Sequence, residues 1–341
     1  MCAKFDKKLV QNNTEEKGKF FKKLGLVWKF IFKPKNKESP DTKPSSPLDA
    51  SKLAEAPVPE DGRRKHALLI GVSYKGTKYE LKGTINDVKT MKDWLINNFG
   101  FKAENIRILT EEEPNEELKP TKENIRNSMK WLVKDCGGRD SLVFYFSGHG
   151  LRQPDFENDE RDGFDETICP IDYLTAGMIL DNEIYSTIVR PLPEGVTLHA
   201  IVDACHSGTV LDLSYVYNRE TKTWDDNSPP SGVKKNTSGG LAITISACRD
   251  DQMAADTDAF SEDDVKMSGA LTHTLTSHVS KGNEITYGKL LDAIYKDIED
   301  ADKRGWIVGR LLRKLFNARL LQKPQLSTSE PFDVYQKRFY L

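Results

Sequence analysis

Cysteine is scarce in this chain of 341 residues, and its distribution excludes two classes of protein. The five cysteines are odd in number and no two form a CxxC pair; they are Cys2, Cys136, Cys169, Cys205 and Cys248. A disulfide framework needs paired cysteines, and a zinc finger needs closely spaced ligand pairs. The sequence therefore predicts neither disulfides nor zinc, and it favours a reducing compartment, the cytoplasm or the nucleus.

Long hydrophobic runs are also missing. No apolar run approaches the roughly 20 residues that a membrane-spanning helix needs. The N-terminus lacks the uncharged core and the small-residue cleavage site of a secretory signal. Hydrophobic residues make up 38% of the chain and charged residues 30%, which is enough for a packed core in water.

The first 63 residues differ from the rest. The first 37 residues carry eleven lysines and only three acids, and six prolines fall between residues 34 and 61. This composition predicts a basic, proline-rich tail that is mostly disordered. Residues 17–35 alternate lysine with bulky apolar side chains, which fits a basic helix lying on an anionic membrane. A tail that docks a partner protein is the alternative.

Beyond residue 64 the pattern is typical of an α/β protein. Continuous apolar runs predict buried strands, and stretches with helical spacing predict helices. The expected strands are 66–72, 104–110, 141–147, 197–205 and 239–248; the expected helices are 85–99, 121–132, 268–280 and 286–303. Strands that alternate with helices predict a doubly wound, mostly parallel sheet.

Two of these strands run into reactive residues. One strand is followed by Gly148 and His149, and another by Ala204 and Cys205. Chemistry in an open parallel sheet takes place past the carboxyl ends of the strands, where neighbouring ends meet. A cysteine needs a base to become a thiolate near neutral pH, and His149 is the candidate base for Cys205. The alternative is a buried structural thiol and a turn histidine.

The motifs FYFSGHG (144–150) and VDACHSG (202–208) resemble the paired signatures of the caspase-type cysteine peptidases, and more narrowly those of the metacaspases. The similarity extends over 64–341 and includes LKGTINDV (81–88), DGFDETICPID (162–172) and PQLSTSEPFD (324–333). The short interior linker resembles type I metacaspases, although the zinc finger that many plant members carry is absent. The resemblance implies a six-stranded caspase-like sheet, with a large-subunit-like region (64–213), a linker (214–240) and a small-subunit-like region (241–341).

The same resemblance implies roles for individual residues. Cys205 would attack the scissile carbonyl, and His149 would be the acid and base. The backbone amides of Gly150 and Cys205 would stabilise the oxyanion. His206 is expected to be structural.

Acidic residues near the predicted strand ends indicate the substrate. Carboxylates that face one cleft suit a guanidinium or ammonium group. The resemblance places Asp87, Ser147 and Asp203 in the first specificity pocket and implies cleavage after Arg or Lys. Asp87 also suits the N-terminus of a helix, and the two roles are compatible. Thr84 stands where many metacaspases have a cysteine.

Calcium is the cofactor that the resemblance implies. Residues 155–166 contain seven acids and one arginine, which suits either a solvated loop or a hard cation. The resemblance maps the calcium ligands to Asp165, Asp181, Asn182 and Asp212, with Asn182 at a position where family members often have a second aspartate.

The expected partners are protein and peptide substrates. Basic residues in the linker are candidate self-cleavage sites; they are Arg219, Lys222, Lys234 and Lys235. The resemblance favours a monomer, and the acidic main domain argues against a nucleic-acid partner. The family resemblance also implies a role in programmed cell death or the stress response. The alternative function is a non-catalytic caspase-like scaffold that acts through its basic tail.

Overall fold

The computed structural model describes residues 63–156, 160–161, 163–204, 207–229, 232, 235–247, 270–280, 284–304 and 324–341. These residues belong to one compact unit, which extends from Val58 to Leu341. The basic tail with its segment 17–35, the predicted nucleophile Cys205 and the linker residue Lys234 lie outside the described residues.

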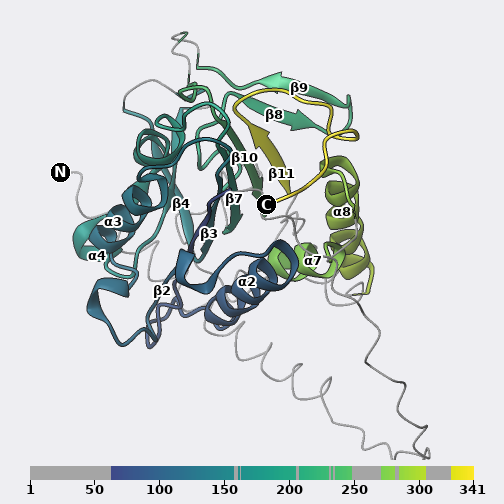
Figure 1. Ribbon diagram of the computed structural model, residues 1–341. Helices are drawn as coiled ribbons and strands as arrows, with labels where there is room; N and C mark the ends of the chain where they lie inside the picture. Colours follow the sequence, from purple (N-terminus) through teal and green to yellow (C-terminus); the bar gives the residue numbers. More distant parts are fainter. Residues whose placement is uncertain are drawn as a thin grey trace, which may run out of the picture. The chain divides into compact units, whose positions relative to one another are not determined.

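A mainly parallel sheet forms the centre of the unit (Figure 1). Its strand order is β2-β1-β3-β7-β10-β11-β8-β9. Five neighbouring strands are parallel, namely β1 (Lys65–Gly71), β2 (Ile106–Thr110), β3 (Ser141–Ser147), β7 (Thr197–Asp203) and β10 (Leu241–Ser246). The sixth, β11 (Gln325–Thr328), is antiparallel to β10. The prediction of an α/β fold with a mostly parallel sheet is confirmed.

In the part of the chain that the structure describes, the central sheet has eight strands instead of the expected six. The additional pair is the antiparallel hairpin of β8 (Tyr215–Asn218) and β9 (Thr223–Asp226), which joins the edge strand β11. This hairpin lies in the segment 214–240, which was expected to be a linker. Two aromatic side chains hold the hairpin against the rest of the unit. Tyr217 packs in the core, and the indole N–H of Trp224 donates to the carbonyl of Phe332 at 2.7 Å.

Helices cover both faces of the sheet (Figure 1). One face packs against α2 (Thr84–Phe99), α7 (Ala270–His278) and α8 (Tyr287–Arg304). The other packs against α3 (Lys122–Val133), α5 (Asp181–Ile184) and the π-helical turn η4 (Tyr185–Val189). Because each central strand is covered on both faces, its side chains are apolar without alternation, which is why the continuous runs predicted these strands.

Helix boundaries follow local signals. The hydroxyl of Thr121 accepts the N–H of Asn124 and caps α3, as expected for an N-cap threonine. Helix α2 ends at Gly100, which has a φ of 70°, a left-handed conformation that glycine adopts readily. Two short 3₁₀ turns, η2 (Ala103–Asn105) and η3 (Glu116–Leu118), complete this half of the unit.

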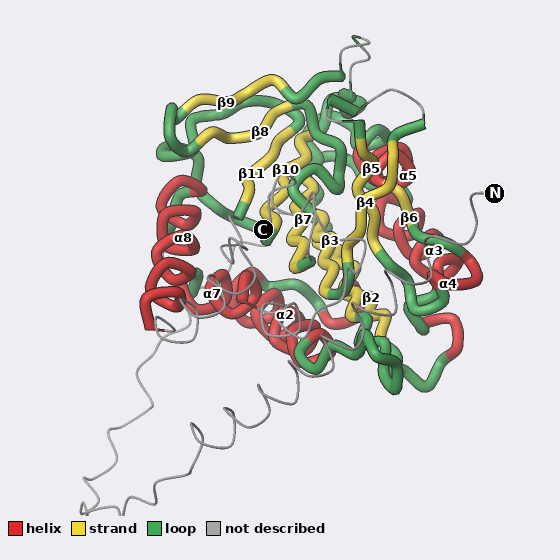
Figure 2. Tube along the Cα trace, turned by 180° about the vertical axis from the view of Figure 1, so that it is seen from behind, coloured by secondary structure: helices red, strands yellow, loops and turns green. Residues whose placement is uncertain are grey.

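A smaller antiparallel sheet follows directly after His149 (Figure 2). It consists of β4 (Gly150–Pro154), β5 (Phe164–Ile168) and β6 (Ile179–Leu180), with the short helix α4 (Tyr173–Ala176) between β5 and β6. The sequence did not predict it, because β4 is short and polar. None of the helices in the described ranges is both long enough and apolar enough to cross a lipid bilayer.

Candidate active site

Three parallel strands end side by side at the carboxyl edge of the central sheet. Gly71 at the end of β1 pairs with Ser147 at the end of β3, and Ser147 pairs with Asp203 at the end of β7. His149 follows Ser147 by two residues, just as position 205 follows Asp203. The strand register therefore brings Ser147 and Asp203 next to each other, two positions before His149 and Cys205 in the sequence. Cys205 itself lies outside the described residues.

His149 is held from two sides. Its backbone N–H donates to the Tyr74 hydroxyl at 3.0 Å, and that hydroxyl donates to the carbonyl of Cys169 at 2.6 Å. The ring nitrogen Nε2 lies 2.9 Å from the backbone carbonyl of Tyr79. A carbonyl only accepts, so Nε2 carries the hydrogen and the basic lone pair is on Nδ1.

The surroundings of His149 keep its ring neutral. The side chain is buried, and burial lowers its pKa below the ordinary value, although the hydrogen bond to Tyr79 opposes this shift. A neutral imidazole with a fixed tautomer can accept a proton at neutral pH. Gly148 permits the turn, since a Cβ there would lie 2.8 Å from the ring of Phe146.

The structure brings Asp87, Ser147 and Asp203 together at the same edge. Ser147 is completely buried, and its hydroxyl donates to Asp87 Oδ2 at 3.4 Å. Asp87 lies in the first turn of α2, so it also has the helix N-terminal position that the sequence allowed. Burial and the charge of Asp203 raise the pKa of Asp87 to about 7, against the hydrogen bond from Ser147.

Asp203 receives two hydrogen bonds from one residue of α7. The backbone N–H of Thr272 donates to Asp203 Oδ2 at 3.0 Å, and the Thr272 hydroxyl donates to the same oxygen at 2.8 Å. Because the hydroxyl proton of Thr272 is donated to Asp203, Thr272 Oγ1 can only accept from Tyr145, and the Tyr145 hydroxyl donates to it at 2.7 Å. Donors of this kind favour the ionised carboxylate.

Two buried carboxylates therefore lie near each other at this edge of the sheet. The two Thr272 donors favour the charged form of Asp203, while burial and that neighbouring charge raise the pKa of Asp87 to about 7. Like charges in a desolvated site repel each other, and a cation that enters between them relieves the repulsion. This pair of carboxylates thus suits a cationic group.

The residues expected to bind calcium lie near one another at β5 and the segments that pack against it. Asp181 is fully buried, and its carboxylate accepts the backbone N–H groups of Glu166 and Asn182, each at 2.7 Å. Asp165 is buried and accepts from Gln153 at 3.1 Å. Burial and the charge of Asp212 raise the pKa of Asp181 to about 8.

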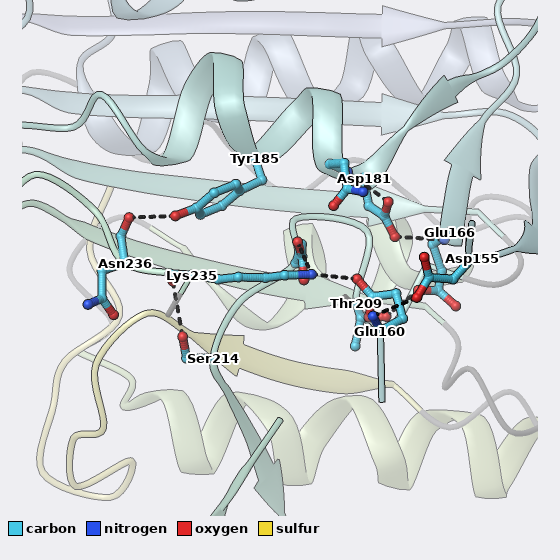
Figure 3. Close-up of polar contacts among 11 residues, drawn as sticks. Asp155, Glu160, Glu166, Asp181, Tyr185, Thr209, Ser214, Lys235 and Asn236 are labelled. Carbon is cyan, nitrogen blue, oxygen red and sulfur yellow. Dashed lines mark hydrogen bonds and ion pairs between the residues drawn. The ribbon is translucent and has the colours of Figure 1, made fainter. Parts of the chain in front are cut away.

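Asp212, the fourth residue expected to bind calcium, contacts Lys235. Figure 3 shows the contact of the same lysine with Glu160. Lys235 Nζ lies 2.5 Å from Asp212 Oδ2 and 2.7 Å from Glu160 Oε1. Within the described part of the chain, no three His, Cys, Asp or Glu side chains are grouped so that they could hold a metal ion. The cation of this cluster is the lysine ammonium.

Sequence reasoning missed several of these contacts. The Tyr79 carbonyl, Thr272 and Glu160 were not singled out, and Lys235 was considered only as a cleavage site. A backbone carbonyl has no sequence signature, and Glu160 lies in a charge run whose members look alike.

Comparisons with known proteins find a family and several relatives for this chain. A family model described as metacaspase, peptidase C14 domain, matches residues 65–214. Metacaspase-1 of Arabidopsis thaliana is 44% identical over 319 residues, which cover 89% of this chain and 86% of that protein. Metacaspase-2 of the same plant is 44% identical, with 84% and 74% covered. Metacaspase-1 of Meyerozyma guilliermondii is 36% identical, with 80% and 71% covered.

A likeness to a solved structure was also found. The crystal structure of protein GSU0716 from Geobacter sulfurreducens has a TM-score of 0.47 and 22% sequence identity, and it covers 80% of this chain and 97% of that chain. A likeness at this level supports no argument about function.

Proposed function

Since the chain belongs to the metacaspase family of cysteine peptidases, we propose that it cleaves peptide bonds after Arg or Lys, with Cys205 as nucleophile and His149 as base. The observation that carries the specificity is the buried pair Asp87 and Asp203 at the sheet edge that also holds His149. Family membership and the presence of both catalytic residues argue against the non-catalytic scaffold.

The contacts of His149 suggest how the reaction proceeds. Nδ1 of His149 accepts the thiol proton of Cys205, and the thiolate attacks the scissile carbonyl carbon. The positive ring that forms is stabilised by the hydrogen bond from Nε2 to the Tyr79 carbonyl. His149 then returns the proton to the leaving amine. The backbone N–H groups of Gly150 and Cys205 are the proposed oxyanion donors.

The side chain of the substrate residue before the cleaved bond would enter the acidic pocket. Its guanidinium or ammonium group would bind the carboxylates of Asp87 and Asp203 through charge-assisted hydrogen bonds, beside the Ser147 hydroxyl. The test compares fluorogenic peptides that end in Arg, Lys or Asp. We expect turnover of the Arg and Lys peptides only, and cleavage after Asp would refute the proposed pocket.

Calcium is the proposed activator. The residue types suit a hard divalent cation, because calcium takes carboxylate and amide oxygens as ligands. Burial, and after it the charge of Asp212, raises the pKa of Asp181 to about 8. Asp165, Asp181 and Asp212 would hold the ion, together with the amide oxygen of Asn182. Bound calcium would supply positive charge that orders the loops around the active site. Peptide hydrolysis with calcium and with a chelator tests this requirement.

Thr272 gives a prediction about the specificity pocket. Thr272→Val removes the hydroxyl donor to Asp203 but keeps the backbone N–H and the branched shape. Loss of one hydrogen bond to a charged group costs about 1.5–3 kcal/mol, so KM for an Arg peptide should rise about 10-fold or more, with kcat nearly unchanged. Thr272→Ser should restore KM; equal damage in both variants would indicate a packing role instead.

The raised pKa of Asp87 gives a prediction about pH. A protonated Asp87 contributes no charge, so KM for an Arg peptide should fall as the pH rises through about 7. Asp87→Asn should remove this change. The pKa of His149 is lowered by burial. The fall in kcat that protonation of His149 causes should therefore lie below pH 6.5, the ordinary histidine value. Rates measured between pH 5.5 and 8.5 at saturating calcium test this, and the same KM profile in both proteins would contradict it.

A further inference from the structure

A tyrosine hydroxyl lies between two strand segments of the smaller sheet, at the end next to the active site. The Tyr74 hydroxyl accepts the backbone N–H of His149 at 3.0 Å and donates to the carbonyl of Cys169 at 2.6 Å. The backbone N–H of Cys169 donates directly to the His149 carbonyl at 3.0 Å. His149 and Cys169 therefore face each other across the ladder that continues into β4 and β5 (Figure 2).

The Tyr74 hydroxyl takes the place of one hydrogen bond of this ladder. In an antiparallel ladder, a hydrogen-bonded pair of residues exchanges two N–H···O bonds, and such pairs alternate with pairs that exchange none. His149 and Cys169 exchange one bond directly, and the tyrosine hydroxyl bridges the other. The pair just beyond the other end of β4 follows the same alternation, because the N–H of Asp155 donates to the carbonyl of Gly163 at 3.0 Å.

This alternation determines where the N–H of Gly150 points. Gly150 pairs with Ile168, next to the hydrogen-bonded pair, so it belongs to a pair that exchanges no bonds. Its N–H is therefore directed away from β5, and β4 lies at the edge of the smaller sheet. Gly150 is the residue proposed as an oxyanion donor, and such a donor has to be held where negative charge develops.

Tyr74 is itself held firmly. Its side chain is 1% exposed, and its ring lies against the ring of His149, with the centroids 4.7 Å apart. The Thr77 hydroxyl donates to the Tyr74 carbonyl at 2.8 Å and accepts the N–H of Tyr79 at 3.1 Å. One loop therefore holds His149 twice, by its backbone through the Tyr74 hydroxyl and by its ring through the Tyr79 carbonyl.

We propose that Tyr74 is a positioning residue for the reaction: its hydroxyl fixes the backbone that carries the base His149 and the oxyanion donor Gly150. Tyr74 acts through these two groups. A displacement of a catalytic group by about 1 Å can lower the rate about 100-fold. The inference rests on the proposed function, because it takes His149 as the base and Gly150 as a donor.

Tyr74→Phe removes the hydroxyl and keeps the ring. We expect kcat for an Arg peptide to fall about 10- to 100-fold, with KM changed by less than about twofold. An Arg peptide aldehyde provides a second readout. The Cys205 thiol adds to its carbonyl carbon, the thiol proton passes to the carbonyl oxygen, and that tetrahedral oxygen needs the same donors. Its inhibition constant should rise by about the same factor as kcat falls, whereas a smaller folded fraction would leave this constant unchanged.

Tyr287→Phe is the matched control. Tyr287 is also buried, and its hydroxyl is hydrogen-bonded to Nε2 of the buried His199. His199 lies near the beginning of β7, away from the carboxyl edge of the sheet. The two variants should lower Tm by similar amounts, but Tyr287→Phe should keep the parent kcat and inhibition constant. Equal losses of kcat in the two variants would overturn the specific role of Tyr74.

Thr77 provides a second variant that decides the question if Tyr74→Phe does not fold. Thr77 is exposed, so Thr77→Val should fold, although it loses the hydroxyl that joins Tyr74 to Tyr79. We expect kcat to fall and the aldehyde inhibition constant to rise, each about 3- to 10-fold. Thr77→Ser should restore both values. Parent values in Thr77→Val would overturn the role of this loop.

Alkylation of Cys205 by iodoacetamide separates failure of this inference from failure of the proposed function, because it needs no peptide. The reagent reacts with the thiolate, so Tyr74→Phe should slow the reaction about 10-fold at pH 7, toward the rate of His149→Ala. If the parent cleaves no Arg peptide, the proposed function fails, and the alkylation rates still decide the role of Tyr74. If the parent cleaves it and Tyr74→Phe keeps the parent kcat, inhibition constant and alkylation rate, the role of Tyr74 is overturned and the proposed function stands.

Discussion

Cys205→Ala and His149→Ala are each expected to lower kcat/KM for an Arg peptide by about 1,000-fold or more. The first change removes the nucleophile, and the second removes the base that takes its proton. Because the two residues act as one unit, the double variant should be no slower than either single variant by more than a few-fold. Steady-state rates and single-turnover rates of the purified proteins provide the measurement.

Cys136→Ala is the matched control for this prediction. Cys136 is a half-buried thiol whose pKa is raised by burial and by Asp140, so it is a poor nucleophile. Its variant should keep the full rate. If His149→Ala keeps more than a tenth of the parent rate, another group acts as the base. The assignment of His149 Nδ1 as the proton acceptor would then be wrong.

The second large effect concerns Asp203. Asp203→Asn keeps an oxygen that can accept from Thr272, so the local geometry is preserved while the carboxylate is lost. Truncating or neutralising one partner of a buried charge pair costs about 2–5 kcal/mol. We therefore expect kcat/KM for an Arg peptide to fall about 100-fold or more, mostly through KM.

Asp87→Asn should have a smaller effect at pH 7 than Asp203→Asn. Burial and the charge of Asp203 raise the pKa of Asp87 to about 7, so only about half of its charge is present before the substrate binds. Asp93→Asn, on the exposed side of the same helix, is the control and should leave KM unchanged. Equal losses for Asp87→Asn and Asp203→Asn at pH 7 would contradict the raised pKa of Asp87 as the reason for its smaller contribution.

The sequence predicted the central sheet because its strands are covered on both faces. Runs such as 66–72 and 141–147 are apolar without interruption, and they became β1 and β3. The strands at the periphery have no such signal. β4 and β9 are short and polar, and each is ordered by its neighbours: β4 by pairing with β5, and β9 by Trp224 and its contact with Phe332.

The sequence predicted that Ser147 and Asp203 lie at the same edge of the sheet, because each ends a buried strand. Ser147 and Asp203 end neighbouring parallel strands, and the register that pairs them follows from the sheet. Their partners could not be predicted in the same way. Thr272 meets Asp203 from 69 positions away, and Tyr79 meets His149 through a backbone carbonyl. Lys235 and Glu160 are separated by 75 positions, and no local pattern pairs them.

The most direct test of the central claim is covalent capture with a peptide chloromethyl ketone that carries Arg, followed by peptide mass spectrometry. The thiolate of Cys205 should displace chloride and form one adduct, which is absent or much slower to form in His149→Ala and is weakened by Asp203→Asn. The matching Asp reagent should not react. An adduct on Cys136 or Cys169, or preference for the Asp reagent, would contradict the proposed nucleophile and pocket.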